Sequence, residues 1–285
     1  MLTELHGKGG RVCKEARKGN IRCGLIVRPT SEDVITGHLA QAFRVLNPRW
    51  WLPDILNIGL KARRFRRQVF RGLQVEPWRN RPRYPRDLLP WDEGSTQVDL
   101  TISFENPPTT IYFELKYLAD LSPHVTNGHA GFPSDQLIRN IRVGLLECGW
   151  FCRDDRGEEE GQFRGDGKPP RDFVCILLSP FKGNEVVQYY RDSGRLLAAI
   201  PHSDRLMGLP RNPFIGELTY GEVSRVLKRQ RNRFTRPERQ IVDHLVEYLA
   251  FKLERITLGQ CPSTSSPAQT SNTTEKPIQV IGGDS

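Results

Sequence analysis

The sequence lacks several features that would place the protein in a familiar class. No apolar run reaches the roughly 18 residues that a membrane-spanning helix needs. There is no glycine-rich phosphate loop with the lysine and hydroxyl that a nucleotide-driven motor requires. No Gly-x-Ser-x-Gly turn or Cys–His pattern indicates covalent catalysis. These absences argue against a helical membrane protein, an NTPase motor and a hydrolase of the nucleophile-elbow type.

Cysteine is sparse and has no metal-binding spacing. Of the six cysteines, neither the pair Cys13 and Cys23 nor the pair Cys148 and Cys152 matches a standard zinc pattern. We interpret Cys148 and Cys152 as small core residues near the end of a helix. The N-terminal residues also lack the apolar core of a secretory signal. We therefore expect a cytoplasmic protein with reduced thiols and no membrane partner.

Positive charge is in excess. Lysine and arginine number 42 against 33 aspartate and glutamate residues, a formal net charge of +9. A pI of about 9.4 is typical of nucleic-acid-binding domains, although a basic protein can also bind other anionic partners. Two basic runs, Arg63–Arg71 and Lys228–Arg239, could line a phosphate-binding channel. The alternative is that they are solvated helix faces.

Composition along the chain suggests one domain with two appendages. Residues 1–28 are basic and glycine-rich, which is typical of a flexible arm. Residues 29–258 contain the periodic apolar segments and are expected to form a single domain. Residues 259–285 are rich in Ser, Thr and Pro, and we expect a disordered tail.

The first helix places an acid beside its apolar stripe. Apolar residues recur at helical spacing from Ile35 to Leu46, and Asn47-Pro48 ends the pattern. Glu32 lies one turn before Ile35 and so falls on or beside the inward face. A second packed segment follows, and the prolines between residues 77 and 90 then indicate an irregular loop.

A hairpin carries the strongest chemical signal. Polar and apolar residues alternate over 98–104 and over 111–117, and Asn106-Pro107-Pro108 forms the turn. Asp99 points away from its apolar neighbours, and so do Glu114 and Lys116. Directly opposed residues of such a pair have Cβ atoms roughly 5 Å apart. The pattern therefore predicts that Asp99 faces Glu114 or Lys116, on one face of the hairpin.

The segments after the hairpin predict an α/β fold. A helix begins near Ser134 and continues to Cys148, and 173–178 is an apolar run typical of a strand buried on both faces. Further helical patterns cover 185–199, 219–227 and 237–256. We therefore expect a central mixed β-sheet flanked by helices on both faces. An ordinary solvated hairpin is the competing interpretation, but a covered sheet leaves charges little solvated face.

Magnesium chemistry would explain these residues. Mg²⁺ prefers oxygen ligands and usually takes one or two protein carboxylates together with water and phosphate oxygens. Asp99 and Glu114 meet that requirement, and the backbone carbonyl of Leu115 could add a third oxygen. Lys116 could orient the attacking water or stabilise the developing charge. Glu32 could be a further ligand or a supporting base.

At this point the sequence resembles the PD-(D/E)xK nuclease superfamily, which is also called restriction-endonuclease-like. The resemblance covers roughly residues 29–180 and rests on Glu32, Val98-Asp99, Glu114-Leu115-Lys116 and Gln136. It implies metal binding by the aspartate and glutamate, a catalytic lysine, support from the helix glutamate, and a glutamine that completes the site. Val98 replaces the proline of the family name, as in many members.

The resemblance implies a Mg²⁺-dependent endonuclease, with Mn²⁺ as a substitute ion. The expected substrate is DNA more than RNA, in restriction, phage defence, mobile-element or repair contexts. Many such enzymes dimerise, so a homodimer or a partner subunit is a further expectation. Two alternatives remain: a catalytically inactive nuclease-like module that binds nucleic acid or a partner, and a basic scaffold in which Glu32 points away from the hairpin.

Overall fold

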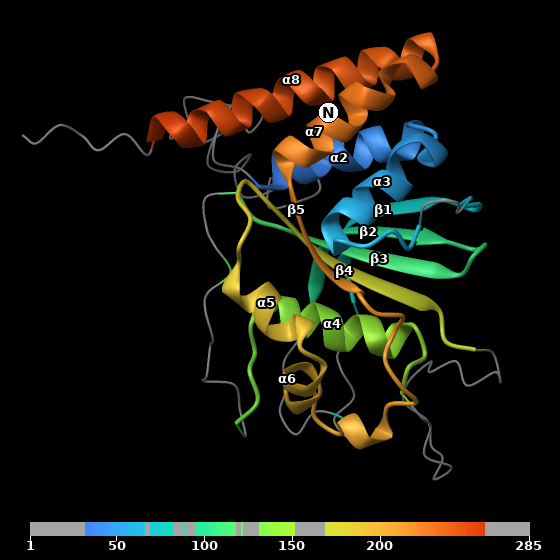
Figure 1. Cartoon of the computed structure of the whole chain (residues 1–285), viewed down its shortest axis with the longest axis vertical. Helices are drawn as coiled ribbons and strands as arrows, with labels where there is room; N and C mark the ends of the chain where they lie inside the picture. Colours follow the sequence, from blue (N-terminus) through green and yellow to red (C-terminus); the bar gives the residue numbers. More distant parts are fainter. Residues whose placement is uncertain are drawn as a thin grey trace, which may run out of the picture.

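The computed structural model describes residues 32–65, 69–81, 88, 95–117, 121, 131–151 and 169–259. In this part the chain forms three layers, with a central mixed sheet and helices on both of its faces (Figure 1). The expected α/β class with a helix-flanked mixed sheet is therefore confirmed. The expected arm, 1–28, lies outside the described residues, as does all of the expected tail except Gly259.

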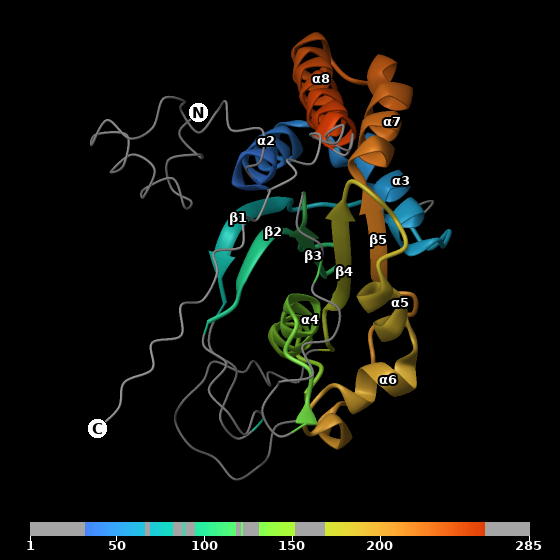
Figure 2. The ribbon, with the colours of Figure 1, turned by 90° about the vertical axis from the view of Figure 1, so that its left-hand side faces the viewer.

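The sheet has five strands in the order in which they occur along the chain. They are β1 (Gln74–Asn80), β2 (Gln97–Phe104), β3 (Thr109–Leu115), β4 (Asp172–Ser179) and β5 (Ile215–Thr219). β2 is antiparallel to both of its neighbours, β1 and β3, whereas β3, β4 and β5 run parallel to one another. Figure 2 shows the strands side by side from β1 to β5. The carboxyl ends of β3, β4 and β5 therefore lie at the same end of the sheet.

The register of the hairpin decides which charged residues meet. Leu100 of β2 lies opposite Phe113 of β3. One further step along the same register brings Asp99 opposite Glu114. Of the two pairings that the sequence left open, the first is therefore the one that forms.

Four helices lie on one side of the sheet and enclose the larger core. They are α2 (Glu32–Val45), α3 (Pro48–Leu60), α7 (Tyr220–Gln230) and α8 (Arg236–Gly259), with the 3₁₀ turn η5 (Arg231–Arg233) between the last two. Helix α8 packs mainly on α2 and α7 rather than on the strands. The other face carries α4 (Gln136–Glu147), α5 (Glu185–Arg191) and α6 (Ser193–Ala198), followed by η4 (Ser203–Arg205). Burial on both faces explains why β4 reads as a continuous apolar run.

Helix α4 lies close to the sheet because of one glycine. A Cβ atom at Gly144 would overlap the ring of Phe173 on β4, so only glycine permits this approach. The N-cap of α4 is Asp135, whose carboxylate accepts a hydrogen bond from the Ile138 N–H at 3.0 Å. The helix that was expected to begin near Ser134 therefore begins at Gln136, directly after this cap.

Three expectations for secondary structure need correction. β1 is a strand that contains Pro77, where the prolines indicated an irregular loop; an edge strand tolerates proline because one side of its backbone is unpaired. The single helix expected over 185–199 is two helices, because Asp192 caps the start of α6. β5 was not foreseen, since its five residues include both Gly216 and Glu217.

The structure also tests the expectations of no membrane-spanning helix and of a cysteine buried in the core. In the described part of the chain, no helix combines the length and the apolar character that crossing a bilayer requires. Cys148 is a free thiol and is buried in the core, as expected. Its expected companion Cys152 lies outside the described residues.

Candidate active site

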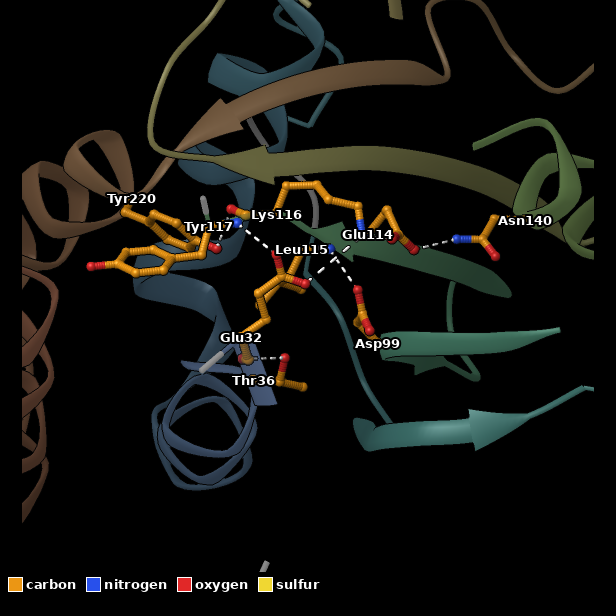
Figure 3. Close-up of polar contacts among 9 residues, drawn as sticks. All are labelled: Glu32, Thr36, Asp99, Glu114, Leu115, Lys116, Tyr117, Asn140 and Tyr220. Atoms are coloured by element: carbon orange, nitrogen blue, oxygen red, sulfur yellow. Dashed lines mark hydrogen bonds and ion pairs between the residues drawn. The ribbon is translucent and has the colours of Figure 1, made fainter. Parts of the chain in front are cut away.

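Four charged side chains meet at the carboxyl end of β3 (Figure 3). Asp99 comes from β2, Glu114 from β3, and Lys116 from the residue just after β3. Glu32 is the first residue of α2 and reaches the same place from the other side. The sequence predicted this meeting for the hairpin residues, and the structure brings all four together.

Glu114 is the buried centre of the cluster. Its side chain is 0% exposed, and each carboxylate oxygen has a partner. Oε2 accepts a hydrogen bond from Nδ2 of Asn140 on α4, at 2.8 Å. Oε1 forms an ion pair with Nζ of Lys116, also at 2.8 Å. The carboxylate is therefore held in a fixed orientation between the helix and the lysine.

Lys116 is held at its backbone as well as at its ammonium group. Its N–H donates to the carbonyl oxygen of Leu178 on β4 at 2.9 Å. Its own carbonyl accepts from the hydroxyl of Tyr220, the first residue of α7, at 2.8 Å. The ammonium lies 3.9 Å from Oε2 of Glu32. The lysine therefore has little freedom at either end.

Glu32 points toward the hairpin. Its Oε1 accepts a hydrogen bond from the backbone N–H of Tyr117 at 3.0 Å (Figure 3). The scaffold alternative requires this side chain to point away, so that interpretation is wrong on this point. The contact also joins the start of α2 to the strand that carries Glu114 and Lys116.

Asp99 lies beside a small polar pocket. Its Oδ2 accepts from the Leu115 N–H at 2.8 Å, which fixes the carboxylate next to the β3 backbone. The pocket has a volume of about 150 Å³. It is lined by Asp33, Ser95, Thr96, Gln97, Asp99, Gln136 and Arg139. Asp99 is thus the member of the cluster that a ligand in this pocket would touch.

Burial and like charge disturb the acids of the cluster. Burial raises the pKa of Asp99 to about 6, although the hydrogen bond from Leu115 and the charge of Lys116 oppose the rise. Burial, together with the negative charge of Asp99, raises the pKa of Glu114 to about 8. With no cation present, the pair of carboxyl groups therefore shares about one proton near neutral pH.

Lys116 stays charged despite its burial. Burial alone would lower the pKa of its ammonium group, but the ion pair with Glu114 and the charges of Glu32 and Asp99 raise that pKa above its usual value. The cluster thus contains one firmly charged cation and three acids. The acids of such a set outnumber its cations, and binding of a proton or a divalent cation can balance the excess negative charge.

The donor set fits magnesium but not a metal cage built from protein alone. Among the described residues, no group of three or more His, Cys, Asp or Glu side chains is arranged to hold a metal ion. Mg²⁺ commonly uses one or two carboxylates and takes its other oxygens from water and phosphate. Asp99 and Glu114 are two such carboxylates; burial is the main cause of their raised pKa values, and a cation would stabilise their charged forms.

Two of the predicted supporting groups, Gln136 and Leu115, lie next to Asp99, and the roles expected of them stay predictions. Gln136 is the first residue of α4 and lines the pocket beside Asp99, but Asn140 is the residue that bonds to Glu114. Asn140 lies one helical turn after Gln136 on the same face, so an i to i+4 inspection could have found it. Leu115 contributes its N–H to Asp99, and the role of its carbonyl as a metal ligand stays a prediction.

Two tyrosines near the site were missed by the sequence analysis. Tyr220 and Tyr117 are buried, and each donates its hydroxyl to a backbone carbonyl. No local pattern signals such a bond, because the partner of Tyr220 lies 104 residues away in the chain.

Comparison of the chain with protein-family models, with curated proteins and with solved structures found no match. The resemblance to PD-(D/E)xK nucleases therefore rests on the residues and their arrangement.

Proposed function

We propose that the protein is a metal-dependent nuclease that hydrolyses phosphodiester bonds, with DNA as the favoured substrate. The observation that carries the proposal is the buried pair of carboxylates, Asp99 and Glu114, beside the firmly charged Lys116. A buried cluster with an excess of acid destabilises the fold unless it binds a cation or a proton. Perturbed acids next to a polar pocket are also typical of catalytic sites.

Each residue has a stated role in the proposal. Asp99 and Glu114 would hold the ion, with Glu32 and the Leu115 carbonyl as further oxygen donors. Mg²⁺ at this place would lower the pKa of a water molecule and neutralise charge on the scissile phosphate. The ammonium of Lys116 orients the attacking water and stabilises the negative charge that develops on phosphorus-bound oxygen. Asn140 keeps the carboxylate of Glu114 in position.

The reaction is hydrolysis and needs no other reactant. The oxygen of water bonds to phosphorus and the ester P–O bond breaks. The proton that the water loses is matched by the proton that the leaving oxygen takes up. The products are one phosphomonoester end and one hydroxyl end. No step requires a nucleotide cofactor, which agrees with the absence of a phosphate loop in the sequence.

The finer fold assignment belongs to the same proposal. A mixed, helix-flanked sheet with the acids and lysine on its central hairpin is what the PD-(D/E)xK resemblance implies. The net charge of +9 supports a polyanionic substrate. A cytoplasmic location and a role in restriction, phage defence, mobile elements or repair are the contexts that accompany this assignment. Fold alone does not determine function, so the site carries the argument.

A cleavage assay tests the proposal directly. Plasmid DNA, linear duplex DNA, single-stranded DNA and RNA are incubated with the full chain in Mg²⁺, Mn²⁺ or EDTA. We expect cleavage of DNA in Mg²⁺ and Mn²⁺ and none in EDTA. Asp99→Asn and Lys116→Ala are expected to abolish it, while Arg195→Ala, at an exposed position of α6, serves as the control.

The outcomes separate the two candidate functions. Metal-dependent cleavage lost in both site variants and kept in the control supports the enzyme. Salt-sensitive binding of nucleic acid without any cleavage supports the inactive binding module instead. Cleavage that persists in Asp99→Asn and Lys116→Ala contradicts the assignment of this site.

A further inference from the structure

The pocket beside Asp99 is built by three separate parts of the fold. Asp33 comes from the first turn of α2, and Ser95, Thr96 and Gln97 come from the segment that enters β2. Gln136 and Arg139 come from the first turns of α4. The pocket is therefore fixed by elements on both faces of the sheet, and it opens next to the candidate metal ligand.

Arg139 supplies the positive charge of this pocket, whose lining also includes the carboxylates of Asp33 and Asp99. It lies three residues after Gln136, so both side chains project from the same face of α4. Arg139 is half-buried, and of the described residues that line the pocket it alone is basic. A guanidinium group in a polar recess is suited to a phosphate, because its N–H groups can donate two parallel hydrogen bonds to phosphate oxygens.

The size of the pocket limits what it can hold. Its volume of about 150 Å³ is below the roughly 300–1,000 Å³ of ordinary small-molecule sites. A whole nucleotide would not be enclosed, whereas one phosphate with its linking sugar atoms would be. The amide of Gln136 and the hydroxyl of Ser95 supply neutral hydrogen-bonding groups for such a fragment.

We propose that this pocket binds the backbone phosphate next to the scissile one, with Arg139 as the residue that binds it. The inference rests on the proposed nuclease function and adds a substrate-positioning residue to it. Binding at this place sets the register of the strand across Asp99 and Glu114, because phosphate contacts fix how a nucleic acid is positioned on a protein. Arg139 contacts the backbone and therefore does not read the base sequence.

Equilibrium binding tests this proposal without requiring cleavage. The full chain is titrated against a fluorescein-labelled single-stranded DNA oligonucleotide in EDTA, and fluorescence anisotropy is recorded over a range of salt concentrations. The proteins are wild type, Arg139→Gln, Arg139→Lys and the charge-matched control Arg195→Ala. Thermal unfolding of each variant confirms that the proteins compared are folded.

The expected results are specific to one phosphate contact. Arg139→Gln is expected to weaken binding about tenfold or more, as the loss of a charge-assisted hydrogen bond does. Its plot of log K against log salt should become shallower by about 0.7, the amount for one phosphate on a single strand. Arg139→Lys should keep most of the salt slope and lose part of the affinity, because lysine retains the charge without the paired donors.

The control gives the result that overturns the proposal. If Arg195→Ala changes affinity and slope as much as Arg139→Gln does, the effect is general charge and the pocket is not a phosphate site. Unchanged binding by Arg139→Gln, or no binding by the wild type, overturns it equally. The cleavage assay is independent of this measurement, so metal-dependent cleavage combined with unchanged binding would leave the proposed function standing and remove only the pocket's role.

Discussion

Two charged clusters lie on the same face of the same hairpin, and they differ in how their charge is balanced. The first is the site cluster of Asp99, Glu114, Lys116, Glu32 and Asn140. The second, the balanced cluster, consists of Arg81, Thr101, Tyr112 and Glu147. Thr101 and Tyr112 are opposed in the hairpin register, two residues along from Asp99 and Glu114. Helix α4 spans both, with Asn140 over one and Glu147 over the other.

The balanced cluster pairs its cation with its own carboxylate. Nη1 of Arg81 lies 2.9 Å from Oε2 of Glu147, and Nη2 donates to the hydroxyl of Thr101 at 2.5 Å. The guanidinium also stacks 4.8 Å from the centroid of the Tyr112 ring, and the Tyr112 hydroxyl donates to Glu147. One cation thus meets one carboxylate, and such a cluster can serve the fold without a ligand.

The site cluster leaves its charge unresolved. Three acids meet one ammonium group, and the pKa values of both Asp99 and Glu114 are raised. The comparison teaches that burial of charge does not by itself indicate function. What points to function is an excess of buried acids over cations, because such a cluster has a reason to bind a further cation.

The largest expected difference between the clusters is in activity. Asp99→Asn keeps the acceptor for the Leu115 N–H but removes the charge, so it should lower kcat by roughly a thousandfold or more. Its stability in EDTA should be unchanged or higher, since a buried charge is gone. Nuclease rates and urea unfolding of the same preparations measure both effects.

In the balanced cluster, the variant to compare with Asp99→Asn is Arg81→Met. It leaves the carboxylate of Glu147 without its partner, and we expect unfolding to become easier by about 3 kcal/mol. The folded fraction should cleave at the wild-type rate. The comparison fails if Arg81→Met lowers kcat as much as Asp99→Asn does while the protein remains folded.

The next effect is the dependence of stability on pH and metal. The folded pKa values of Asp99 and Glu114, about 6 and about 8, lie above the ordinary values of 3.8 and 4.5. The folded state therefore binds protons more tightly than the unfolded state, so this contribution to stability is complete at low pH and is lost as pH rises toward 8.

Thermal unfolding at a series of pH values tests this sign. In EDTA the wild-type protein should lose stability between about pH 4.5 and pH 8, and Mg²⁺ should restore it at pH 8 but not at pH 5. Asp99→Asn should flatten the pH dependence and remove the response to Mg²⁺. An equal Mg²⁺ response in that variant would show that the ion acts elsewhere.

A smaller effect distinguishes the two polar residues of α4. Asn140 bonds to Glu114, whereas Gln136 lines the pocket. Asn140→Ala should therefore lower kcat about 10- to 100-fold, as the loss of a group that orients a metal ligand does. Gln136→Ala should act mainly on KM. Steady-state kinetics of both variants measure the difference, and the reverse pattern would show that Gln136 rather than Asn140 supports the metal ligand.

The smallest expected effect compares two buried tyrosines. The Tyr220 hydroxyl donates to the carbonyl of Lys116 at 2.8 Å, and the Tyr117 hydroxyl donates to the carbonyl of Lys252 on α8 at 2.7 Å. Each Tyr→Phe change should cost about 1 kcal/mol of stability. Only Tyr220→Phe should also lower kcat, by several-fold, because it loosens the backbone of the lysine. Equal kcat values in the two variants would show that Tyr220 has a purely structural role.

The sequence anticipated the parts of the site that depend on local pattern. Period-two alternation placed Asp99, Glu114 and Lys116 on the polar side of two strands, and helical spacing turned Glu32 toward them. The apolar run of β4 was also clear, since a strand buried on both faces has no polar positions to show. Strand β1 was not, because Pro77 is acceptable only at a sheet edge, and edge position is a property of the whole sheet.

The sequence by itself determined which side chains share a face, because that follows from the repeat of a strand or helix. Tertiary structure alone decided that Asn140 rather than Gln136 reaches Glu114, since packing of Gly144 against Phe173 sets where α4 lies on the sheet. It also decided that Tyr220 holds Lys116 from α7. Above all, it buried two carboxylates together, and burial is the physical cause that separates this cluster from an ordinary charged hairpin.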